Sequence, residues 1–129
     1  MPDFGFVGES KARELFGDKR YEATRTNAPA GRRRDLIRLA DSVVFGQVYP
    51  RPGLTPEQRS LSTVAALTVL GQLPQLRAHV TGALNVGVSE DEIAEVITQM
   101  AMYAGFPAAL NAMQVADECF DAVATERKK

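Results

Sequence analysis

Three side chains in the middle of the chain are of types that exchange protons and bind acids. His79 is the only histidine among the 129 residues, and Arg51 and Arg59 precede it. An imidazole exchanges protons near neutral pH because its ordinary pKa is about 6.5. A planar guanidinium binds a carboxylate through two hydrogen bonds. These three residues together predict a small-molecule site.

Glycines and prolines fall mostly where helices would begin or end, so the chain is predicted to be all-α. The helix that carries His79 is predicted to run from Pro74 to Gly87, a suitable left-handed residue after its last turn. The preceding helix is predicted to follow Thr55 as N-cap and to end at Gly71.

The sequence of the carboxyl-terminal third predicts two more helices. Ser89 and Glu92 have the spacing of a capping box, and the helix that they start is expected to end at Gly105. Pro107 is expected to open the last helix. Tyr103 and Pro107 are interpreted as packing residues at this junction.

The amino-terminal part is less regular, and residues 1–34 are the least defined segment. A short helix is predicted over residues 9–16, followed by a polar stretch over 18–34 that contains helix breakers. A longer helix is predicted from Arg33 to near Pro50. Its apolar residues recur every three or four positions, which predicts one buried face made of Leu36, Ile37, Leu39, Ala40, Val43, Val44 and Val48. About six helices in a single domain over residues 1–129 are therefore expected.

Composition narrows the function classes. Lys and Arg total 15 against 16 for Asp and Glu, so no broad basic surface for nucleic acid is expected. The single cysteine, Cys119, cannot form an intramolecular disulfide, and the chain has no Cys/His cluster of the usual metal-site spacing. No apolar run is long enough to span a bilayer, and no signal peptide is recognisable. We expect a soluble, cytoplasmic protein with no metal and no membrane partner.

Four segments in a fixed order resemble the carboxymuconolactone decarboxylase family, within the alkylhydroperoxidase-D-like class of small helical proteins. They are FGQVYPRPGL (45–54), EQRSL (57–61), LRAHVTGALNVGVSEDEIAEVITQ (76–99) and YAGFPAALNA (103–112). The resemblance implies a cofactor-independent carboxy-lyase for an unsaturated lactone acid such as 4-carboxymuconolactone. In such a substrate the conjugated ring carbonyl accepts the electrons that CO₂ leaves behind.

The resemblance assigns roles to the candidate residues. Arg51 and Arg59 would orient the carboxylates, and His79 would protonate a ring carbon. The oxygen that gains charge would accept hydrogen bonds from Gln47, Tyr49 or Ser60. The family's asparagine before the helix-ending glycine is retained as Asn85. Structural roles for His79 in the helix surface, and for both arginines in salt bridges, remain open at this stage.

Two departures from the related patterns bear on the reaction. Family decarboxylases tend to carry Gly-Glu-x-Trp where this chain has Gly46, Gln47, Val48 and Tyr49, so a carboxylate and an indole are missing and another substrate is possible. The thiol branch of the class carries Cys-x-x-Cys where this chain has Gln72 and Gln75. A single thiol cannot complete the disulfide cycle, so a peroxidase is not expected.

Two alternatives to decarboxylation of a 4-carboxymuconolactone-like acid remain. The same fold could serve another cofactor-independent reaction of a biosynthetic pathway, or it could be a noncatalytic helical oligomer that binds a metabolite or a protein. A homo-oligomer is expected in each case, a hexamer built as a trimer of dimers. The resemblance implies it, and the apolar segment 62–70 offers more hydrophobic surface than a small monomer covers.

Overall fold

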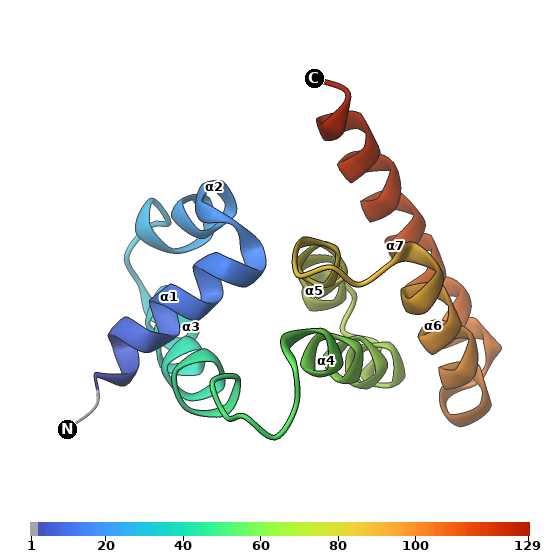
Figure 1. The fold of residues 1–129 in the computed structure, drawn as a ribbon, viewed down its shortest axis with the longest axis horizontal. Coiled ribbons are helices and arrows are strands. Elements are labelled where there is room, and N and C mark those ends of the chain that lie inside the picture. Colours follow the sequence, from blue (N-terminus) through green and yellow to red (C-terminus); the bar gives the residue numbers. More distant parts are fainter. Residues whose placement is uncertain (1–2) are drawn as a thin grey trace. The chain divides into compact units, whose positions relative to one another are not determined.

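The protein consists of helices joined by short turns, as the computed structural model of residues 3–129 shows (Figure 1). These residues form seven α-helices and two π-helical segments, and no strand occurs among them. The all-α prediction is confirmed, with one helix more than the six expected. Two compact units make up the chain: unit 1 ends at Thr55, and unit 2 spans Pro56–Lys129. The expectation of a single domain stays a prediction.

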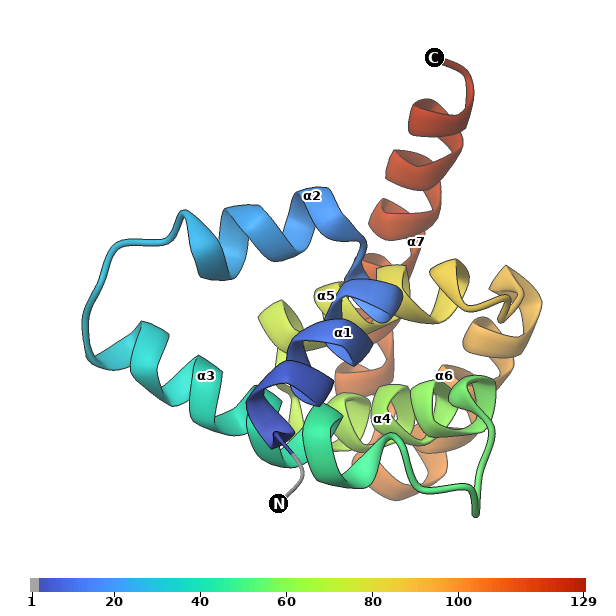
Figure 2. The same ribbon diagram turned by 60° about the vertical axis from the view of Figure 1, so that its left-hand side comes forward.

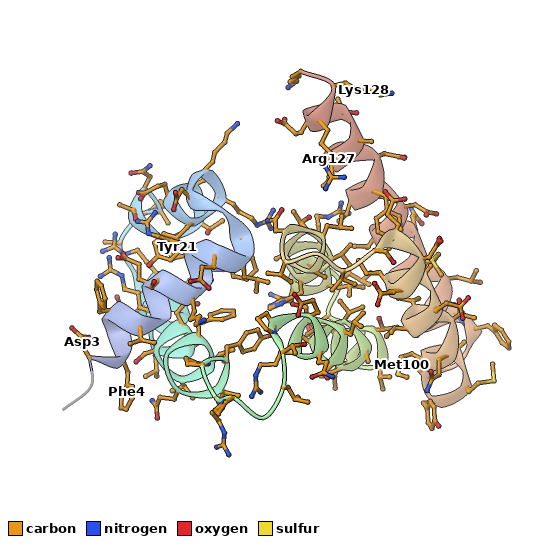
Figure 3. All side chains as sticks on the ribbon, in the orientation of Figure 1. Asp3, Phe4, Tyr21, Met100, Arg127 and Lys128 are labelled. Carbon is orange, nitrogen blue, oxygen red and sulfur yellow. The ribbon has the colours of Figure 1, made fainter. Side chains whose placement is uncertain are left out.

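Unit 1 contains five helical elements: α1 (Phe4–Phe16), α2 (Asp18–Tyr21), the π-helical η1 (Glu22–Thr26), α3 (Arg32–Val43) and the π-helical η2 (Val44–Val48). Helix α1 begins where the Asp3 carboxylate accepts a hydrogen bond from the Phe6 N–H at 3.0 Å. Asp3 and Phe4 are labelled at this end of α1 in Figure 3. The predicted helix over residues 9–16 therefore begins earlier than expected. The stretch 18–34, expected to be irregular, contains α2 and η1.

Two glycines allow the backbones of unit 1 to come into contact. A Cβ atom at Gly8 of α1 would lie 2.6 Å from the carbonyl oxygen of Asp41 in α3. A Cβ atom at Gly46 of η2 would meet the carbonyl oxygen of Phe4 in α1. Neither position has room for a side chain, so glycine at both positions allows the backbone of α1 to pack directly against α3 and η2.

A buried ion pair joins η1 to α3. The Arg25 guanidinium donates two hydrogen bonds to the Asp41 carboxylate, at 2.8 Å from Nε and 2.9 Å from Nη2. The two side chains are only 14% and 10% exposed. The same guanidinium lies over the rings of Phe16 and Tyr21, at 5.1 and 5.6 Å from their centres. This cluster fixes the side of α3 that faces the interior of unit 1.

The prediction that the apolar residues of α3 and η2 form a buried face is wrong. Leu36 is 66% exposed and Leu39 is 62% exposed, while Asp41 on the other side of the helix is buried. Of the seven residues assigned to the face, one is half-buried (Ile37) and six are exposed (Leu36, Leu39, Ala40, Val43, Val44 and Val48). Periodicity identified residues that share one side of a helix, but that side is not the one that packs within unit 1. The helix also ends at Val43, before η2.

Unit 2 is a bundle of four helices: α4 (Pro56–Leu70), α5 (Leu73–Asn85), α6 (Glu90–Ala104) and α7 (Phe106–Arg127). Helix α4 packs against α5, α6 and α7, and α7 also packs against α5 and α6 (Figures 1 and 2). The core of unit 2 consists of small and branched apolar side chains from all four helices and from the turn before α6: Val64, Leu76, Val80, Ala83, Val88, Ile93, Ile97, Ala101, Ala109, Ala112, Val115, Ala116 and Cys119.

The predicted ends of the unit 2 helices are largely confirmed. Ser89 and Glu92 form the expected capping box, with hydrogen bonds of 3.1 and 3.0 Å between each side chain and the other residue's N–H. Gly87 and Gly105 end α5 and α6 with φ angles of 103° and 94°, which favour glycine. Tyr103 is 73% exposed, so its expected role in packing the helix junction is wrong. Within the described part of the chain, no helix has both the length and the apolar character needed to cross a bilayer.

Candidate active site

Four of the seven candidate residues lie on two helices of unit 2 that pack against each other. Arg59 and Ser60 lie where the first turn of α4 passes into the second, and His79 lies in the middle of α5. Only Gly71 and Gln72 separate the two helices, and Gly71 has a φ of 69° that allows the tight turn. The sequence therefore places a cation, a hydroxyl and an imidazole on one helical hairpin.

His79 lies at the edge of the buried side of α5. Leu76 and Val80 are fully buried on that side, and α5 packs there against α4 and α7. His79 itself is half-buried. The core therefore fixes the helix that carries this imidazole, while the residue itself keeps part of its surface exposed. That arrangement suits a group that exchanges protons with a small molecule.

The hydroxyl of Ser60 is buried without a hydrogen bond. Ser60 is 0% exposed, and among residues 3–129 no partner lies within hydrogen-bonding geometry of its Oγ. Other hydroxyls of α4 bond to the backbone one turn earlier: Thr68 to the Val64 carbonyl and Ser62 to the Gln58 carbonyl, both at 2.8 Å. A buried polar group without a hydrogen-bond partner lowers the stability of the fold. One explanation for such a group is that it forms a hydrogen bond with a ligand.

Asn85 is the last residue of α5 and is exposed. The helix ends at this residue because the next two residues form a turn. In this turn the N–H groups of Val86 and Gly87 donate hydrogen bonds to the carbonyls of Gly82 and Leu84, respectively. Asn85 therefore lies almost two turns beyond His79 on the same helix.

The other three candidates, Gln47, Tyr49 and Arg51, belong to unit 1. They follow one another at the end of η2, where the Tyr49 N–H bonds to the Val44 carbonyl at 2.8 Å and the Arg51 N–H to the Val48 carbonyl at 3.1 Å. Gln47 and Arg51 are exposed.

Tyr49 is half-buried, and its ring packs against Phe45 edge to face with 4.8 Å between the ring centres. Phe45 packs in the same manner against Phe16 of α1. The ring that stands in place of the family's indole is therefore supported by an aromatic cluster of unit 1.

Unit 1 also contains a hollow of about 360 Å³ that the sequence does not predict. It is lined by α1, α2, η1 and α3, with Glu9, Tyr21, Arg25, Arg38 and Asp41 among the lining residues. Arg25 and Asp41 already form an ion pair with each other. The pKa of the Tyr21 hydroxyl is raised mainly by burial and, to a smaller extent, by the nearby carboxylates of Glu9 and Asp41. Sequence reasoning missed Tyr21 and Arg25 because it treated residues 18–34 as a polar stretch with helix breakers, and without them it had no reason to place Glu9, Arg38 and Asp41 together. None of the seven candidate residues lines the hollow.

Neither a metal site nor a thiol pair is found among the described residues. No three side chains of His, Cys, Asp or Glu gather there as they would around a metal ion. Cys119 is buried in α7, where its thiol donates to the Arg77 carbonyl with a distance of 3.5 Å. Arg77 forms an ion pair with Glu118 at 2.9 Å, which raises the pKa of its guanidinium.

Comparison with known proteins adds three relatives. The chain is 40% identical over 87 residues to a 4-carboxymuconolactone decarboxylase of Acinetobacter baylyi, which covers 67% of this chain and 65% of that protein. It is 41% identical over 71 residues to a nitrosuccinic acid decarboxylase of Metarhizium robertsii, covering 55% of this chain and 50% of that protein. It is 44% identical over 78 residues to an uncharacterized 15.0 kDa protein of Paracoccus denitrificans, covering 59% and 58% of the two chains.

The matches therefore span between half and about two thirds of the relatives' own length. The carboxymuconolactone decarboxylase family matches residues 34–118, from the first turn of α3 to just past the middle of α7. This stretch contains all seven candidate residues and more than half of the chain. The protein belongs to the carboxymuconolactone decarboxylase family.

Proposed function

We propose that this protein is a cofactor-independent carboxy-lyase for a small acid that carries its own electron acceptor. Two relatives are named for such substrates: 4-carboxymuconolactone has an unsaturated lactone, and nitrosuccinic acid has a nitro group. Either group can accept the electron pair that remains when CO₂ leaves. Both acids carry two carboxylates, for which arginine is a suitable partner.

The proposed reaction uses the α4–α5 hairpin. Arg59 orients a carboxylate, and the bond between that carboxyl carbon and its neighbour breaks as CO₂ departs. The electron pair moves into the acceptor, whose oxygen accepts a hydrogen bond from the Ser60 hydroxyl. A protonated His79 then gives its proton to the carbon and regains one from solvent. The observation that carries this proposal is the buried Ser60 hydroxyl without a partner, on the helix packed against the one that carries His79.

The remaining candidates are assigned supporting roles. We propose that Arg51 binds a second carboxylate, that Gln47 and Tyr49 donate hydrogen bonds to the substrate, and that Asn85 contributes to substrate binding. Each of these roles is testable in a single variant.

A second candidate is decarboxylation, or isomerisation, of an acid other than 4-carboxymuconolactone. Gln47 cannot exchange a proton as a glutamate does, although its amide still donates and accepts hydrogen bonds. The family member named for nitrosuccinic acid supports the idea that the fold serves more than one acid.

The experiment is incubation of the purified protein with 4-carboxymuconolactone and, separately, with nitrosuccinic acid, with measurement of CO₂ release. The ultraviolet absorption of the butenolide provides a second signal for the first acid. The His79→Ala variant serves as the control for background decarboxylation. CO₂ release from neither acid by folded protein would contradict the proposal for both substrates.

We further propose a fold of the alkylhydroperoxidase-D-like type, a homo-hexamer and a cytoplasmic location, with a role in the catabolism of aromatic compounds. Family membership supports the fold type and the assembly. The segment 62–70, on which the assembly was partly predicted, contributes two large exposed side chains, Val69 and Leu70. More exposed apolar surface lies on α3 and η2.

A further inference from the structure

The hollow of unit 1 has a charged lining that the proposed reaction does not use. Residues of α1 form one wall and residues of α3 another, and Tyr21 of α2 and Arg25 of η1 complete the lining. Its volume of about 360 Å³ is within the range of small-molecule sites in proteins. Polar and titratable groups that converge on a pocket of this size are typical of a binding site.

The buried ion pair in this lining is complete. Both oxygens of the Asp41 carboxylate accept hydrogen bonds from Arg25, and Arg25 also donates to the Thr24 hydroxyl at 2.8 Å. This pair joins η1 to α3 and is part of the fold. A ligand in the hollow would therefore be bound by the other charged side chains of the lining.

Glu9 of α1 has a carboxylate with only long contacts. The Tyr21 hydroxyl donates to its Oε1 at 3.4 Å, and the nearest nitrogen of Arg13 lies at 3.8 Å. Hydrogen bonds between oxygens in proteins are usually about 2.7–2.8 Å long. Arg13 itself lies closer to the carboxylates of Asp18 and Glu22 than to that of Glu9. The Glu9 side chain is 45% exposed, so its carboxylate can accept hydrogen bonds from a cation in the hollow.

Arg38 carries the corresponding positive charge on the α3 wall. Arg38, Asp41 and Ser42 are three and four residues apart, so they share one side of the helix, and all three line the hollow. Among residues 3–129 the Arg38 guanidinium takes part in no ion pair or hydrogen bond, and the Ser42 hydroxyl takes part in no hydrogen bond. A guanidinium with a hydroxyl one turn away can donate several hydrogen bonds to a carboxylate.

Opposite charges therefore line one hollow without pairing. Glu9 and Arg38 form no ion pair with each other within the described part of the chain. A ligand with both an ammonium group and a carboxylate can bind both side chains, whereas a simple acid or a simple amine can bind only one. Negative charge predominates in the lining, which disfavours a simple acid: the carboxylates are Asp3, Glu9 and Asp41, and the guanidinium groups are Arg25 and Arg38.

Phe6 adds an apolar surface to the hollow. It belongs to the lining, lies three residues before Glu9 on α1, and is 69% exposed. Aromatic side chains beside a few placed polar groups are typical of small-molecule sites. An apolar side chain of a ligand would cover the Phe6 ring and remove apolar area from water.

We propose that the hollow of unit 1 binds a free amino acid with an apolar side chain. Its ammonium group donates hydrogen bonds to Glu9, and its carboxylate accepts them from Arg38 and Ser42. Its side chain packs against Phe6. The walls from α1, α2 and η1 lie before residue 34 and outside the stretch that matches the family. The proposal does not depend on the decarboxylation proposed for the other candidate residues.

A tryptophan at position 6 provides a reporter in the hollow itself. The chain contains no tryptophan, so Phe6→Trp keeps an aromatic ring there and introduces a single indole. The variant is titrated with L-phenylalanine, with 3-phenylpropionate, which lacks the ammonium group, and with phenethylamine, which lacks the carboxylate. We expect L-phenylalanine to shift the indole emission and to bind at least about tenfold more tightly than either analogue, since each lost charge-assisted hydrogen bond lowers affinity about 10- to 100-fold. Calorimetry on the native protein checks that the reporter did not create the site.

Two substitutions assign the charged contacts. Arg38→Met should raise the dissociation constant of L-phenylalanine about tenfold or more and leave that of phenethylamine unchanged. Glu9→Gln should do the same for L-phenylalanine and leave that of 3-phenylpropionate unchanged. Arg33→Met and Glu14→Gln are the matched controls, because both residues are exposed on the same two helices and do not line the hollow.

The proposal has clear contrary outcomes. Neither a change in emission nor heat of binding with L-phenylalanine up to about 10 mM would overturn the site. Equal affinity for L-phenylalanine and 3-phenylpropionate, or for L-phenylalanine and phenethylamine, would overturn the assignment to an amino acid. An Arg38→Met variant that weakens all three probes equally would overturn the contact between Arg38 and the carboxylate.

Discussion

Replacing Ser60 by alanine should make the fold more stable and lower the proposed decarboxylase activity. The hydroxyl is fully buried and has no hydrogen-bond partner among residues 3–129, so it has lost its contacts with water without replacement. Removing it leaves the helix backbone unchanged and places a better helix former in α4. If this hydroxyl donates a hydrogen bond to the substrate, its removal should raise the free energy of unfolding and lower the rate of the reaction.

The magnitude follows from the burial. An unsatisfied buried hydroxyl costs about 1–3 kcal/mol, and part of that gain is offset by the small void that alanine leaves. We expect a net gain of about 1–2 kcal/mol in the free energy of unfolding. With an unfolding entropy of about 2.1 cal/mol/K per residue, this raises the melting temperature by about 4–7 °C. Loss of a hydrogen bond to a charged oxygen should lower kcat/KM about 10- to 100-fold.

The assay combines thermal unfolding followed by circular dichroism with CO₂ release from the proposed substrates, 4-carboxymuconolactone and nitrosuccinic acid. Ser62→Ala is the matched control, because the Ser62 hydroxyl is exposed and bonds to the Gln58 carbonyl at 2.8 Å. We expect that variant to stay within about 0.5 kcal/mol of the native protein and to keep its activity. A lower melting temperature for Ser60→Ala would refute the stability reasoning. A higher one with unchanged activity would refute the role of the hydroxyl toward the substrate.

Three further predictions concern the site and the fold. His79→Ala should lower turnover about a hundredfold or more while the helix content and the assembly mass stay unchanged, because general acid catalysis contributes about 10² to 10⁴; retained activity would move the proton donor elsewhere. Gln47→Glu combined with Tyr49→Trp should increase CO₂ release from 4-carboxymuconolactone, and a native turnover already near 10 per second would indicate that the departure is neutral. Asp41→Ala leaves the Arg25 guanidinium without its counter-charge and should lower the free energy of unfolding by about 3 kcal/mol. The double variant Arg25→Met with Asp41→Leu should recover most of that loss, as thermal unfolding would show. Equal losses in the single and double variants would contradict this account.

The sequence predicted most helix ends because their signals are local. Ser89, Glu92, Gly87 and Gly105 act within one turn of the backbone, so the residue types alone determine the result. The same holds for the turn between α4 and α5, which brings the helices of Ser60 and His79 together.

Burial was predicted less well because it depends on distant parts of the chain. The periodicity of α3 located one apolar side, but the buried side is set by Arg25 from a segment that was expected to be irregular. The π-helical turns of η1 and η2 have no simple signal in residue type. That Ser60 lacks a hydrogen bond depends on the rotamer that its hydroxyl adopts, which spacing cannot predict.

The contact between Gly46 and Phe4 has a consequence for how this chain can vary. Gly46 lies inside the stretch that matches the family, while α1 lies before residue 34 and outside it. Because the backbone of α1 occupies the space that a side chain at position 46 would need, the two positions cannot change independently. A protein shortened to the matched region would expose the side of η2 that leads directly into Gln47 and Tyr49. The boundary at which similarity to relatives fades is therefore not a boundary at which this polypeptide can safely be cut.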